Sequence, residues 1–599
     1  MISACTKVPD QPDQPDLTKR GTTGPLSWEL SPDGVLIISG KGEMPDYQIE
    51  ASDHWDDTCI DCDFSTSTPW NYYDITSVVI NDGVTSIGNN AFYRCKSLKS
   101  VSIPNSVTSI GSKAFSRCGS LTAFVIPSSI TKIGNYAFRW CERLSSIDVD
   151  MNNPEYSSEN GVLFNRTKTI LIQYPSELTG DYTIPGSVTS IENWGFSDCS
   201  GLKSVIIPNS VSSIGKYAFQ SSGLVSVTIG NSVSSIGDRI FDSCEKLTTI
   251  TFGSSVISID FLAFIRCNVI MSFHADDNNP VYSTVDGVLF DKTITRLIKY
   301  PIGKTGAYSI PNSVKYIDAS AFEGCAGLSL VIIPNSVLSI GTSAFSECSG
   351  LKSVIIPNSV TSIEDDAFSQ CYGLSALIIG DSVTSIGKGA FSGCSSLSTL
   401  TIPNSVKSIG EAVFWSCSGL SSVSIGSSLS LIGNIAFLFC SKLTSFTVDE
   451  SNTSFSSENG VLFDKTKTTL LLYPSGKTDN QYNIPDLVTT IGKDAFYGSR
   501  SLNFVNIPNS VTIIGESSFC RCSGLTRITI PNSVTTIDRY AFFECKNLTE
   551  IINESTVPQW LYLATFEGVN KSTCKLFVPA GSVDAYRKAN EWKDFVNII

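Results

Sequence analysis

The residue types best suited to chemistry gather in one acidic segment, residues 53–63, with the sequence Asp-His-Trp-Asp-Asp-Thr-Cys-Ile-Asp-Cys-Asp. Cys59 and Cys62 form a Cys-x-x-Cys pair close to His54, and thiolate, imidazole and carboxylate groups are all metal ligands. A structural zinc site requires further Cys or His ligands, which this segment lacks. In an exported protein the two cysteines can instead oxidise to a small-loop disulfide. The third alternative is an exposed acidic loop that contains neither a metal nor a disulfide. Metal site, disulfide and plain loop remain alternatives here, and we assign no metal.

Catalytic arrangements find little support in the rest of the chain. A Ser-His-Asp triad would depend on His54 or His274, the only two histidines, and no Gly-x-Ser-x-Gly elbow accompanies them. The adjacent carboxylates Asp365 and Asp366 fall at a corner of a repeated unit, which offers no walled pocket for paired acid–base work. We expect no enzymatic activity, no catalytic residue and no cofactor.

A repeat of 23 residues dominates the chain and must position every candidate residue. Its clearest marker is the Phe of an Ala-Phe element, or of a close variant of that dipeptide. The spacing between markers is 23 almost everywhere, 22 once, and 58 or 59 at three places. The markers are Phe92, Phe115, Phe138, Phe196, Phe219, Phe241, Phe264, Phe322, Phe345, Phe368, Phe391, Phe414, Phe437, Phe496, Phe519 and Phe542.

Each unit is predicted to form one coil of a solenoid. In residues 98–104 the pattern Leu-x-x-Val-x-Ile-Pro indicates a short strand with one face inward, and the Pro ends it. Residues 107–111 bring a second apolar pair inward before a Gly corner. The Ala-Phe-x-x-Cys element at 114–118 is too short for a free-standing helix, so we expect a single helical or 3₁₀ turn packed on the stack. Stacked coils bury inward residues that one coil cannot bury alone.

Most cysteines form a column three residues after the marker Phe. Ser222 and Ser499 replace Cys at two of these positions. Neighbouring coils could bring such cysteines into disulfide range, whereas zinc would require ligands clustered at short spacing. Because the column accepts Ser and repeats without pairing, we favour buried, packed thiols. The column comprises Cys95, Cys118, Cys141, Cys199, Cys244, Cys267, Cys325, Cys348, Cys371, Cys394, Cys417, Cys440, Cys522 and Cys545.

The Leu-x-x-Ile-x-Ile-Pro, Ile-Gly, Ala-Phe and Cys elements resemble those of the BspA-like family of bacterial leucine-rich repeats, over about residues 76–552. The resemblance implies a curved solenoid, and together with the reading of the repeat it gives the predicted fold class. That class is a β-rich α/β solenoid, a right-handed leucine-rich-repeat superhelix with a parallel sheet on one face, short helical turns, β-hairpin insertions and terminal caps. Members are typically surface or secreted proteins of bacteria, including Bacteroides-type gut and oral species, and several are linked to adhesion.

The three long intervals contain a second repeated module. Residues 160–175, Asn-Gly-Val-Leu-Phe-Asn-Arg-Thr-Lys-Thr-Ile-Leu-Ile-Gln-Tyr-Pro, recur with small changes near Pro301 and Pro474. Two apolar runs around a polar turn predict a β-hairpin. The predicted domains are an anchor and flexible linker at 1–20, an N-terminal β cap at 21–75, a solenoid at 76–552 with hairpin modules near 150–184, 276–310 and 449–483, and a C-terminal cap with a short helix at 553–599.

The first residues suggest how the chain is anchored. Ile2-Ser-Ala-Cys5 resembles a bacterial lipoprotein cleavage box, in which Cys5 would be the lipidated residue, followed by a Pro-rich acidic tether. The charged and apolar regions that precede such a box are missing, so either translation starts upstream or Cys5 is an accident. We expect a cell-surface or extracellular location, with outer-membrane lipoprotein as one form. The membrane would be contacted only through such an anchor.

The expected partner is a protein or glycan on host cells or neighbouring bacteria. The net charge of −14, without a strong basic patch, would repel a phosphate backbone, so no nucleic acid is expected. The chain is expected to be a monomer. A structural spacer or scaffold without a specific ligand is the alternative function.

One stretch of the outward strand positions differs from the others. Most of these positions are hydroxyl residues, for example Thr399 and Thr401. Three consecutive coils instead carry apolar outward residues, which we predict form an exposed aliphatic stripe and a binding site. The alternative is that β-branched residues simply favour strands. The predicted binding residues are Leu330, Ile332, Ile355, Ala376 and Ile378.

Overall fold

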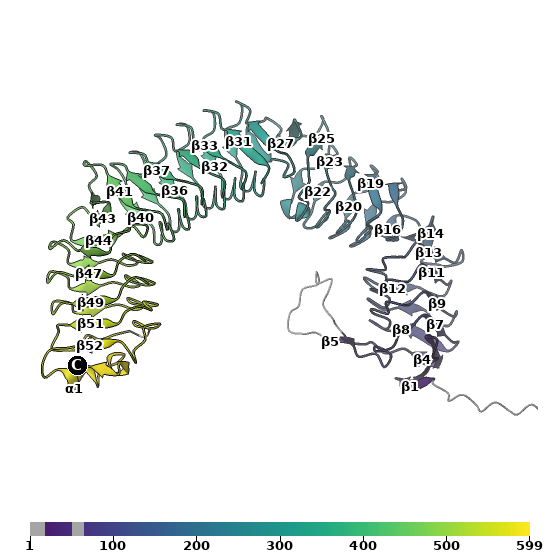
Figure 1. The fold of residues 1–599 in the computed structure, drawn as a ribbon. Coiled ribbons are helices and arrows are strands. Elements are labelled where there is room, and N and C mark those ends of the chain that lie inside the picture. Colours follow the sequence, from purple (N-terminus) through teal and green to yellow (C-terminus); the bar gives the residue numbers. More distant parts are fainter. Residues whose placement is uncertain (1–17, 51–64, 563) are drawn as a thin grey trace, which may run out of the picture. The chain divides into compact units, whose positions relative to one another are not determined.

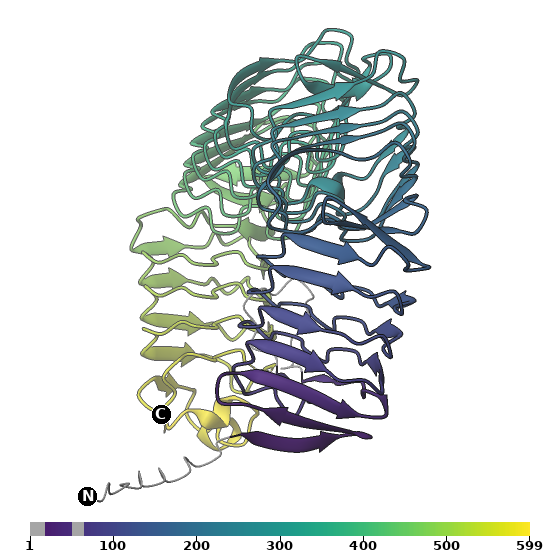
Figure 2. The same cartoon turned by 90° about the vertical axis from the view of Figure 1, so that its right-hand side faces the viewer.

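The computed structural model describes residues 18–50, 65–562 and 564–599 (Figure 1). The candidate residues Cys5, His54, Cys59 and Cys62 lie outside the described residues. The chain forms two compact units that meet in sequence between Tyr282 and Ser283. Within each unit, successive coils stack as a parallel β-solenoid, and Figure 2 shows the strands of the first unit lying one above another.

Each regular coil contributes two strands, one to a longer-stranded sheet and one to a narrow sheet of two-residue strands. The sequence alternation sets the faces. In β33 (Ser353–Ile355), Val354 is buried while Ile355 is exposed, and in β34 (Ser362–Ile363), Ile363 is buried. Both strands pair in parallel with those of the next coil, in the register expected for a 23-residue period.

The first unit begins with an antiparallel meander, β1 (Lys19–Thr23), β2 (Leu26–Leu30) and β3 (Val35–Gly40), and β3 then pairs in parallel with β7. A short antiparallel pair is formed by β5 (Ile49–Glu50) and β6 (Ser65–Thr66). The longer-stranded sheets contain β7 (Ser77–Ile80), β9 (Ser100–Ser102), β11 (Ala123–Ile126), β13 (Ser146–Val149), β17 (Gly180–Thr183), β19 (Leu202–Ile207), β21 (Ser226–Ile229), β23 (Thr249–Phe252) and β25 (Ser272–Ala275). The narrow sheets contain β4 (Gly42–Glu43), β8 (Val84–Ile87), β10 (Ser109–Ile110), β12 (Lys132–Ile133), β18 (Ser190–Ile191), β20 (Ser213–Ile214), β22 (Ser235–Ile236) and β24 (Ser258–Ile259).

The second unit repeats this arrangement. Its longer-stranded sheets contain β29 (Gly306–Ser309), β31 (Leu328–Ile332), β33, β35 (Ala376–Ile378), β37 (Thr399–Ile402), β39 (Ser422–Ile425), β41 (Ser445–Val448), β45 (Gln481–Asn483), β47 (Phe504–Asn506), β49 (Arg527–Ile530), β51 (Glu550–Asn553), β52 (Lys575–Phe577) and β53 (Asn597–Ile598). Its narrow sheets contain β30 (Tyr316–Ile317), β32 (Ser339–Ile340), β34, β36 (Ser385–Ile386), β38 (Ser408–Ile409), β40 (Leu431–Ile432), β46 (Thr490–Ile491), β48 (Ile513–Ile514) and β50 (Thr536–Ile537).

The described residues form almost no helix, so the α/β class, the repeated helical turns and the terminal caps of the predicted fold are not confirmed. Helices in the described residues are limited to α1 (Val583–Tyr586), η1 (Phe261–Phe264) and η2 (Trp592–Asp594). In the other coils the Ala-Phe element is a turn with left-handed residues two positions before and after the Phe, as at Lys113 (φ 55°) and Arg117 (φ 62°). These residues interrupt a helix and direct N–H groups to the next coil instead of four residues back. Among the described residues, no helix has the length and apolar character needed to cross a membrane.

A column of stacked aromatic rings forms the centre of each unit. Phe345, Phe368 and Phe391 are fully buried, with ring centroids 4.9 and 5.3 Å apart. Residues outside the Ala-Phe pattern extend the column, because Trp70 stacks on Phe92 and Phe566 stacks on Phe542. Burying such rings is the main stabilising contribution of each coil.

The inserted modules join the solenoid through their own strands. In the first, β14 (Tyr156–Glu159), β15 (Val162–Asn165) and β16 (Ile170–Gln173) pair antiparallel, and β16 then pairs in parallel with β18. The predicted hairpin is therefore confirmed, and it extends the narrow sheet. The later copies contain β26 (Tyr282–Val285), β27 (Val288–Asp291) and β28 (Arg296–Lys299), and β42 (Phe455–Glu458), β43 (Val461–Asp464) and β44 (Thr469–Leu472).

Candidate functional site

The predicted stripe is an exposed aliphatic patch on the second unit, formed by Leu330, Ile332, Ile355, Ala376 and Ile378. The three isoleucines are 54%, 61% and 59% exposed, and Leu330 is 37% exposed. Ala376 is exposed as well. Ile355 lies opposite Ile378 in the parallel register of β33 and β35. On the neighbouring pair, the Lys352 N–H donates to the Ser329 carbonyl at 3.1 Å, which keeps the same spacing between β31 and β33.

The patch rests on a fixed support. Val331 and Val354 point inward from the same strands and are 3% and 1% exposed. Adjacent strands of a sheet lie about 4.8 Å apart, so the three isoleucines span about 10 Å. Because β31 pairs with β29 and β33 pairs with β35, a partner would meet side chains that are already positioned.

The same column of outward positions continues as a hydroxyl strip, Thr401, Ser424 and Thr447, all exposed. Thr401 is in register with Ser424, and Ser424 with Thr447. These side chains and Ile378 line a shallow groove of ≈ 770 Å³, whose rim includes Asp381. The aliphatic patch therefore continues into a polar groove on one sheet face.

The cysteine column lies inside the solenoid and has no reactive character. Cys371 is fully buried, its Sγ donates to the Phe345 carbonyl at 3.1 Å, and burial raises its pKa to about 12. The same thiol-to-carbonyl bond, at 3.0 to 3.4 Å, is made by Cys118, Cys141, Cys244, Cys267, Cys348, Cys394, Cys417, Cys440, Cys522 and Cys545. The cysteines of the described chain are free thiols, so the prediction of packed thiols is confirmed there.

His274 lies where the repeat places it. The side chain is exposed between the inward Phe273 and Ala275, and its Nε2 lies 3.1 Å from the Ser272 hydroxyl. Thr251 lies opposite it in the parallel register of β23 and β25.

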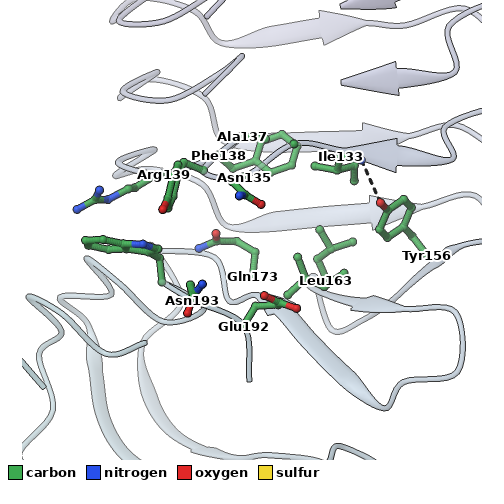
Figure 3. A pocket seen from close by; sticks show the side chains of 14 residues that line it. Ile133, Asn135, Ala137, Phe138, Arg139, Tyr156, Leu163, Gln173, Glu192 and Asn193 are labelled. Carbon is green, nitrogen blue, oxygen red and sulfur yellow. Dashed lines mark hydrogen bonds between the residues drawn. The ribbon is translucent and has the colours of Figure 1, made fainter. Parts of the chain in front are cut away.

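A pocket of ≈ 240 Å³ that the sequence did not predict lies beside β16 in the first unit (Figure 3). It forms because the chain of the inserted module follows a shorter path than a regular coil between the narrow sheet and the aromatic column. A regular coil takes five residues from the buried strand residue to the ring of the aromatic column, as from Ile191 to Phe196. The module takes three, from Leu171, which pairs with Ile191, to Tyr174, whose ring stacks on Phe196 at 5.1 Å. The missing corner leaves a space between the coils above and below.

The lining of this corner pocket combines amides, a carboxylate and an apolar floor. Figure 3 shows Asn135 on one side and Gln173, Glu192 and Asn193 on the other. The floor consists of Ile133, Ala137, Phe138, Leu163 and Ile172. The Tyr156 hydroxyl at its edge accepts a hydrogen bond from the Ile133 N–H at 3.0 Å.

One wall is held rigid by a buried cation–aromatic stack. The Arg139 guanidinium lies 3.4 Å from the Trp194 ring centroid and 3.7 Å from that of Trp140, and Arg139 Nη2 donates to Gln220 at 3.1 Å. Burial raises the pKa of nearby Asp198 to about 6, against the opposing effect of Arg139. Tyr217 covers the Trp194 ring at 4.1 Å, so this ring is part of the wall and not a free stacking platform.

A homologous corner pocket of ≈ 370 Å³ lies beside β44 in the second unit, with a different lining. Leu472 takes the place of Gln173, Gly492 that of Glu192 and Lys493 that of Asn193. The polar lining of the first pocket is therefore not required by the module. The sequence signal for the two pockets is the shortened interval before Tyr174 and before Tyr473. It becomes informative only once these rings are known to fill places in the aromatic column.

The stacked parallel coils, the ring column and the 23-residue register define a leucine-rich-repeat solenoid. The model of the BspA type leucine-rich repeat region, six copies, matches residues 67–180, 174–284, 304–379, 361–478 and 472–570. The chain belongs to this BspA-type leucine-rich-repeat family, which confirms the resemblance seen in its motifs. No curated protein sequence matches the chain.

Two of the solved structures that are similar to this chain come from bacteria. A leucine-rich repeat protein from Bacteroides ovatus is 23% identical, with 74% of this chain and 98% of that chain covered and a TM-score of 0.37. A leucine rich cell surface protein from Faecalibacterium prausnitzii is 27% identical, with 73% and 96% covered and a TM-score of 0.33. The family assignment rests on the repeat model.

Proposed function

We propose that this chain is a non-catalytic cell-surface binding or adhesion protein, whose repeat sheet face binds a protein or glycan partner. The observation that supports it best is the row of three exposed isoleucines, Ile332, Ile355 and Ile378. In the same column the coils on either side carry hydroxyl residues, Ser309 and Thr401. Contiguous apolar surface on a soluble protein commonly marks a partner site.

The energetics favour such a site. Fully burying one isoleucine side chain against a partner contributes roughly 1.5–3 kcal/mol. The strands beneath are already ordered, so association costs little additional conformational entropy.

The surface location is part of the proposal and follows from the family. BspA-type proteins are typically exported by bacteria, and a solenoid of stacked coils suits display at a cell surface. Lipidation of Cys5 stays a prediction, to be tested by mass spectrometry of the protein isolated from its native membrane fraction. The increase in mass from the attached lipid acyl chains would be absent after Cys5→Ser.

The test is capture of partners from defined panels of matrix proteins, mucins and neighbouring bacteria by the purified protein. A variant with Ile332→Glu, Ile355→Glu and Ile378→Glu should lose capture by at least about tenfold, because each charge would have to be desolvated at the interface. The matched control carries Glu at Thr401, Ser424 and Thr447, in the same column, and should retain capture.

Folding of both variants is checked by circular dichroism. Equal capture by the parent and the isoleucine variant would contradict the patch as the site. Absence of capture by the parent from every panel would contradict the binding function and favour a structural spacer.

A further inference from the structure

A regular corner of the solenoid is hydrogen-bonded to the corners of the coils on its two sides. We call the residue three positions before the marker Phe the first corner residue, and the residue after it the second. The first corner residue Lys388 donates its N–H to Asp365 Oδ1 at 2.7 Å, and its carbonyl accepts the Asp366 N–H at 2.8 Å. The second corner residue Gly389 donates its N–H to the Glu411 carbonyl of the following coil at 2.9 Å.

Two further properties of a corner depend on residue type. An Asn or Asp at the first position accepts the N–H of the following corner with its side chain, as Asn89 Oδ1 does from the Ser112 N–H at 2.6 Å. The second corner residue has a positive φ, for example 60° at Gly389, and Gly adopts this conformation without strain. The preferred dipeptide of a corner is therefore Asn or Asp followed by Gly.

At the pocket beside β16, four groups that a regular corner would engage have no partner among the described residues. On the upper wall they are Asn135 Oδ1 and the Tyr136 N–H, and on the lower wall they are the N–H and the carbonyl of Asn193. Figure 3 shows Asn135 and Asn193 on opposite sides of the pocket. The module is two residues shorter than a regular coil between Leu171 and Tyr174. Two corner residues would fill this gap and would engage all four groups.

The pocket beside β44 has the same pattern. Above it are Asn434 Oδ1 and the Ile435 N–H, and below it are the N–H and the carbonyl of Lys493. Within the parts of the chain that the structure describes, these four groups are also without a partner. The side chains around the two pockets differ, so the pattern they share belongs to the corner itself.

The corner that precedes the middle module shows that an open N–H is not forced on a coil beside a module. There Asp260 Oδ1 accepts the N–H of Leu262, the second corner residue, at 2.9 Å. The coils above the two corner pockets carry Gly134 and Gly433 at the place of Asp260, and Gly has no side chain that could accept this N–H.

The directions of the open groups match a turn of another polypeptide. In extended backbone the N–H and the carbonyl of one residue point to the same side. An inserted Asn can therefore donate to Asn135 Oδ1 and accept from the Tyr136 N–H on the upper wall. The next peptide N–H is trans to that carbonyl and points to the lower wall, toward the Asn193 carbonyl. The inserted Asn side chain is then in the position that accepts the Asn193 N–H.

We propose that each corner pocket binds a surface turn of a partner polypeptide, in which Asn or Asp is followed by Gly, in place of the missing corner. Such a turn has Gly as its second central residue, where φ is positive. No residue of the aliphatic patch lines either pocket, so these sites do not depend on the function proposed for the sheet face.

The test is saturation-transfer NMR on the whole protein with the peptide acetyl-Gly-Asn-Gly-Ala-amide as the probe. The matched probe acetyl-Gly-Asn-Pro-Ala-amide lacks the N–H of the second corner residue, and its Pro cannot adopt a positive φ. We expect saturation transfer to the Gly probe, and transfer to the Pro probe that is weaker by about tenfold or more.

A double variant assigns the binding to the pockets. Asn135→Ala with Asn434→Ala removes the side-chain acceptor from both, and transfer to the Gly probe should fall by about fivefold or more. Both residues are exposed, so the core stays intact. The matched control is Asn89→Ala at a regular corner, where Oδ1 is already engaged by Ser112, and it should keep the parent signal.

Three results would overturn the proposal. The first is absence of transfer from the folded parent protein to the Gly probe. The second is equal transfer to the Gly and Pro probes, because the pockets would then not recognise the turn. The third is an unchanged signal in the folded double variant, which would place the peptide outside the corner pockets.

Discussion

The aliphatic patch and the hydroxyl strip occupy consecutive stretches of one outward column, in which the side chains that face solvent change from aliphatic to hydroxyl. Beneath the patch, the rings of Phe345 and Phe368 stack at 4.9 Å, and beneath the strip, those of Phe391 and Phe414 stack at 5.6 Å. The strands of both stretches keep the same parallel register. The contrast shows that inward residues maintain the coil while outward residues are free to specify a partner.

The largest expected effect is a pH dependence of the free energy of unfolding. It tests whether buried thiols stabilise the coils under both the patch and the strip. Burial raises the pKa of Cys371 and of Cys440 to about 12, whereas an unfolded thiol titrates near pH 8.5. The stability from these raised pKa values is fully present below about pH 8.5 and is lost as pH rises toward 12. Urea unfolding followed by circular dichroism should show a falling free energy of unfolding from pH 9 to 11. A free energy that stays constant or rises over this interval would show that the thiols are not buried.

The second prediction concerns the ring column. Phe368→Ala under the patch and Phe414→Ala under the strip should each lower the free energy of unfolding by about 3–5 kcal/mol, because each leaves a cavity in a fully buried stack. The two losses should agree within about 1 kcal/mol if the core is the same under both stretches. Urea unfolding of the two variants measures this, and a clearly larger loss at one position would break the comparison.

A smaller effect is expected from replacing single thiols. Cys371→Ser and Cys440→Ser each retain a donor for the carbonyl that Sγ now contacts, at 3.1 Å from Phe345 and 3.3 Å from Phe414. The repeat itself carries Ser at Ser222. We expect each change to cost about 1 kcal/mol or less, consistent with one modest hydrogen bond retained. Thermal unfolding would reveal a loss of several kcal/mol, which would require another role for the thiol.

The smallest effect on stability is expected at the surface. Thr401→Ile would extend the aliphatic patch by one coil, and Ile378→Thr would shorten it. Exposed substitutions of this kind change stability by about 0.5 kcal/mol or less. Their effect should appear instead in partner capture, which rises in the first variant and falls in the second. Unchanged partner capture by both variants would show that the patch is not the binding site.

Much of the fold was predictable because the same pattern of apolar residues recurs in each coil of the repeat. The 23-residue period fixed the parallel register, and the alternation of Val354 and Ile355 fixed which side chains face solvent. The hairpin of β15 and β16 followed from two apolar runs around a polar turn. The outward position of His274 followed from its place between Phe273 and Ala275.

A helical or 3₁₀ turn was expected because Ala-Phe-x-x-Cys has helical spacing, and among the described coils a 3₁₀ helix is found at Phe261–Phe264 alone. The backbone at Lys113 and Arg117 is left-handed although neither residue is Gly, so the sequence does not indicate this conformation. It is stabilised by hydrogen bonds to the next coil, which no local sequence pattern predicts. Trp70 and Phe566 were missed as members of the ring column because they lack the preceding Ala.

The corner pocket could not be predicted for a related reason. The residues that line it belong to two coils and to the module between them. The pocket arises because the module follows a shorter path than a regular coil, and no sequence motif indicates it. Only the pairing of Leu171 with Ile191 shows that two residues are missing before Tyr174.

The central claim is that the aliphatic patch is the binding surface, and adhesion of protein-coated beads tests it most directly. Beads carrying the parent, the patch variant with three Ile→Glu changes, or the strip variant with Glu at Thr401, Ser424 and Thr447 are applied to surfaces coated with mucin or matrix protein. We predict equal adhesion by the parent and the strip variant on at least one surface, and a decrease of about tenfold or more for the patch variant. Equal adhesion by all three proteins would contradict the claim.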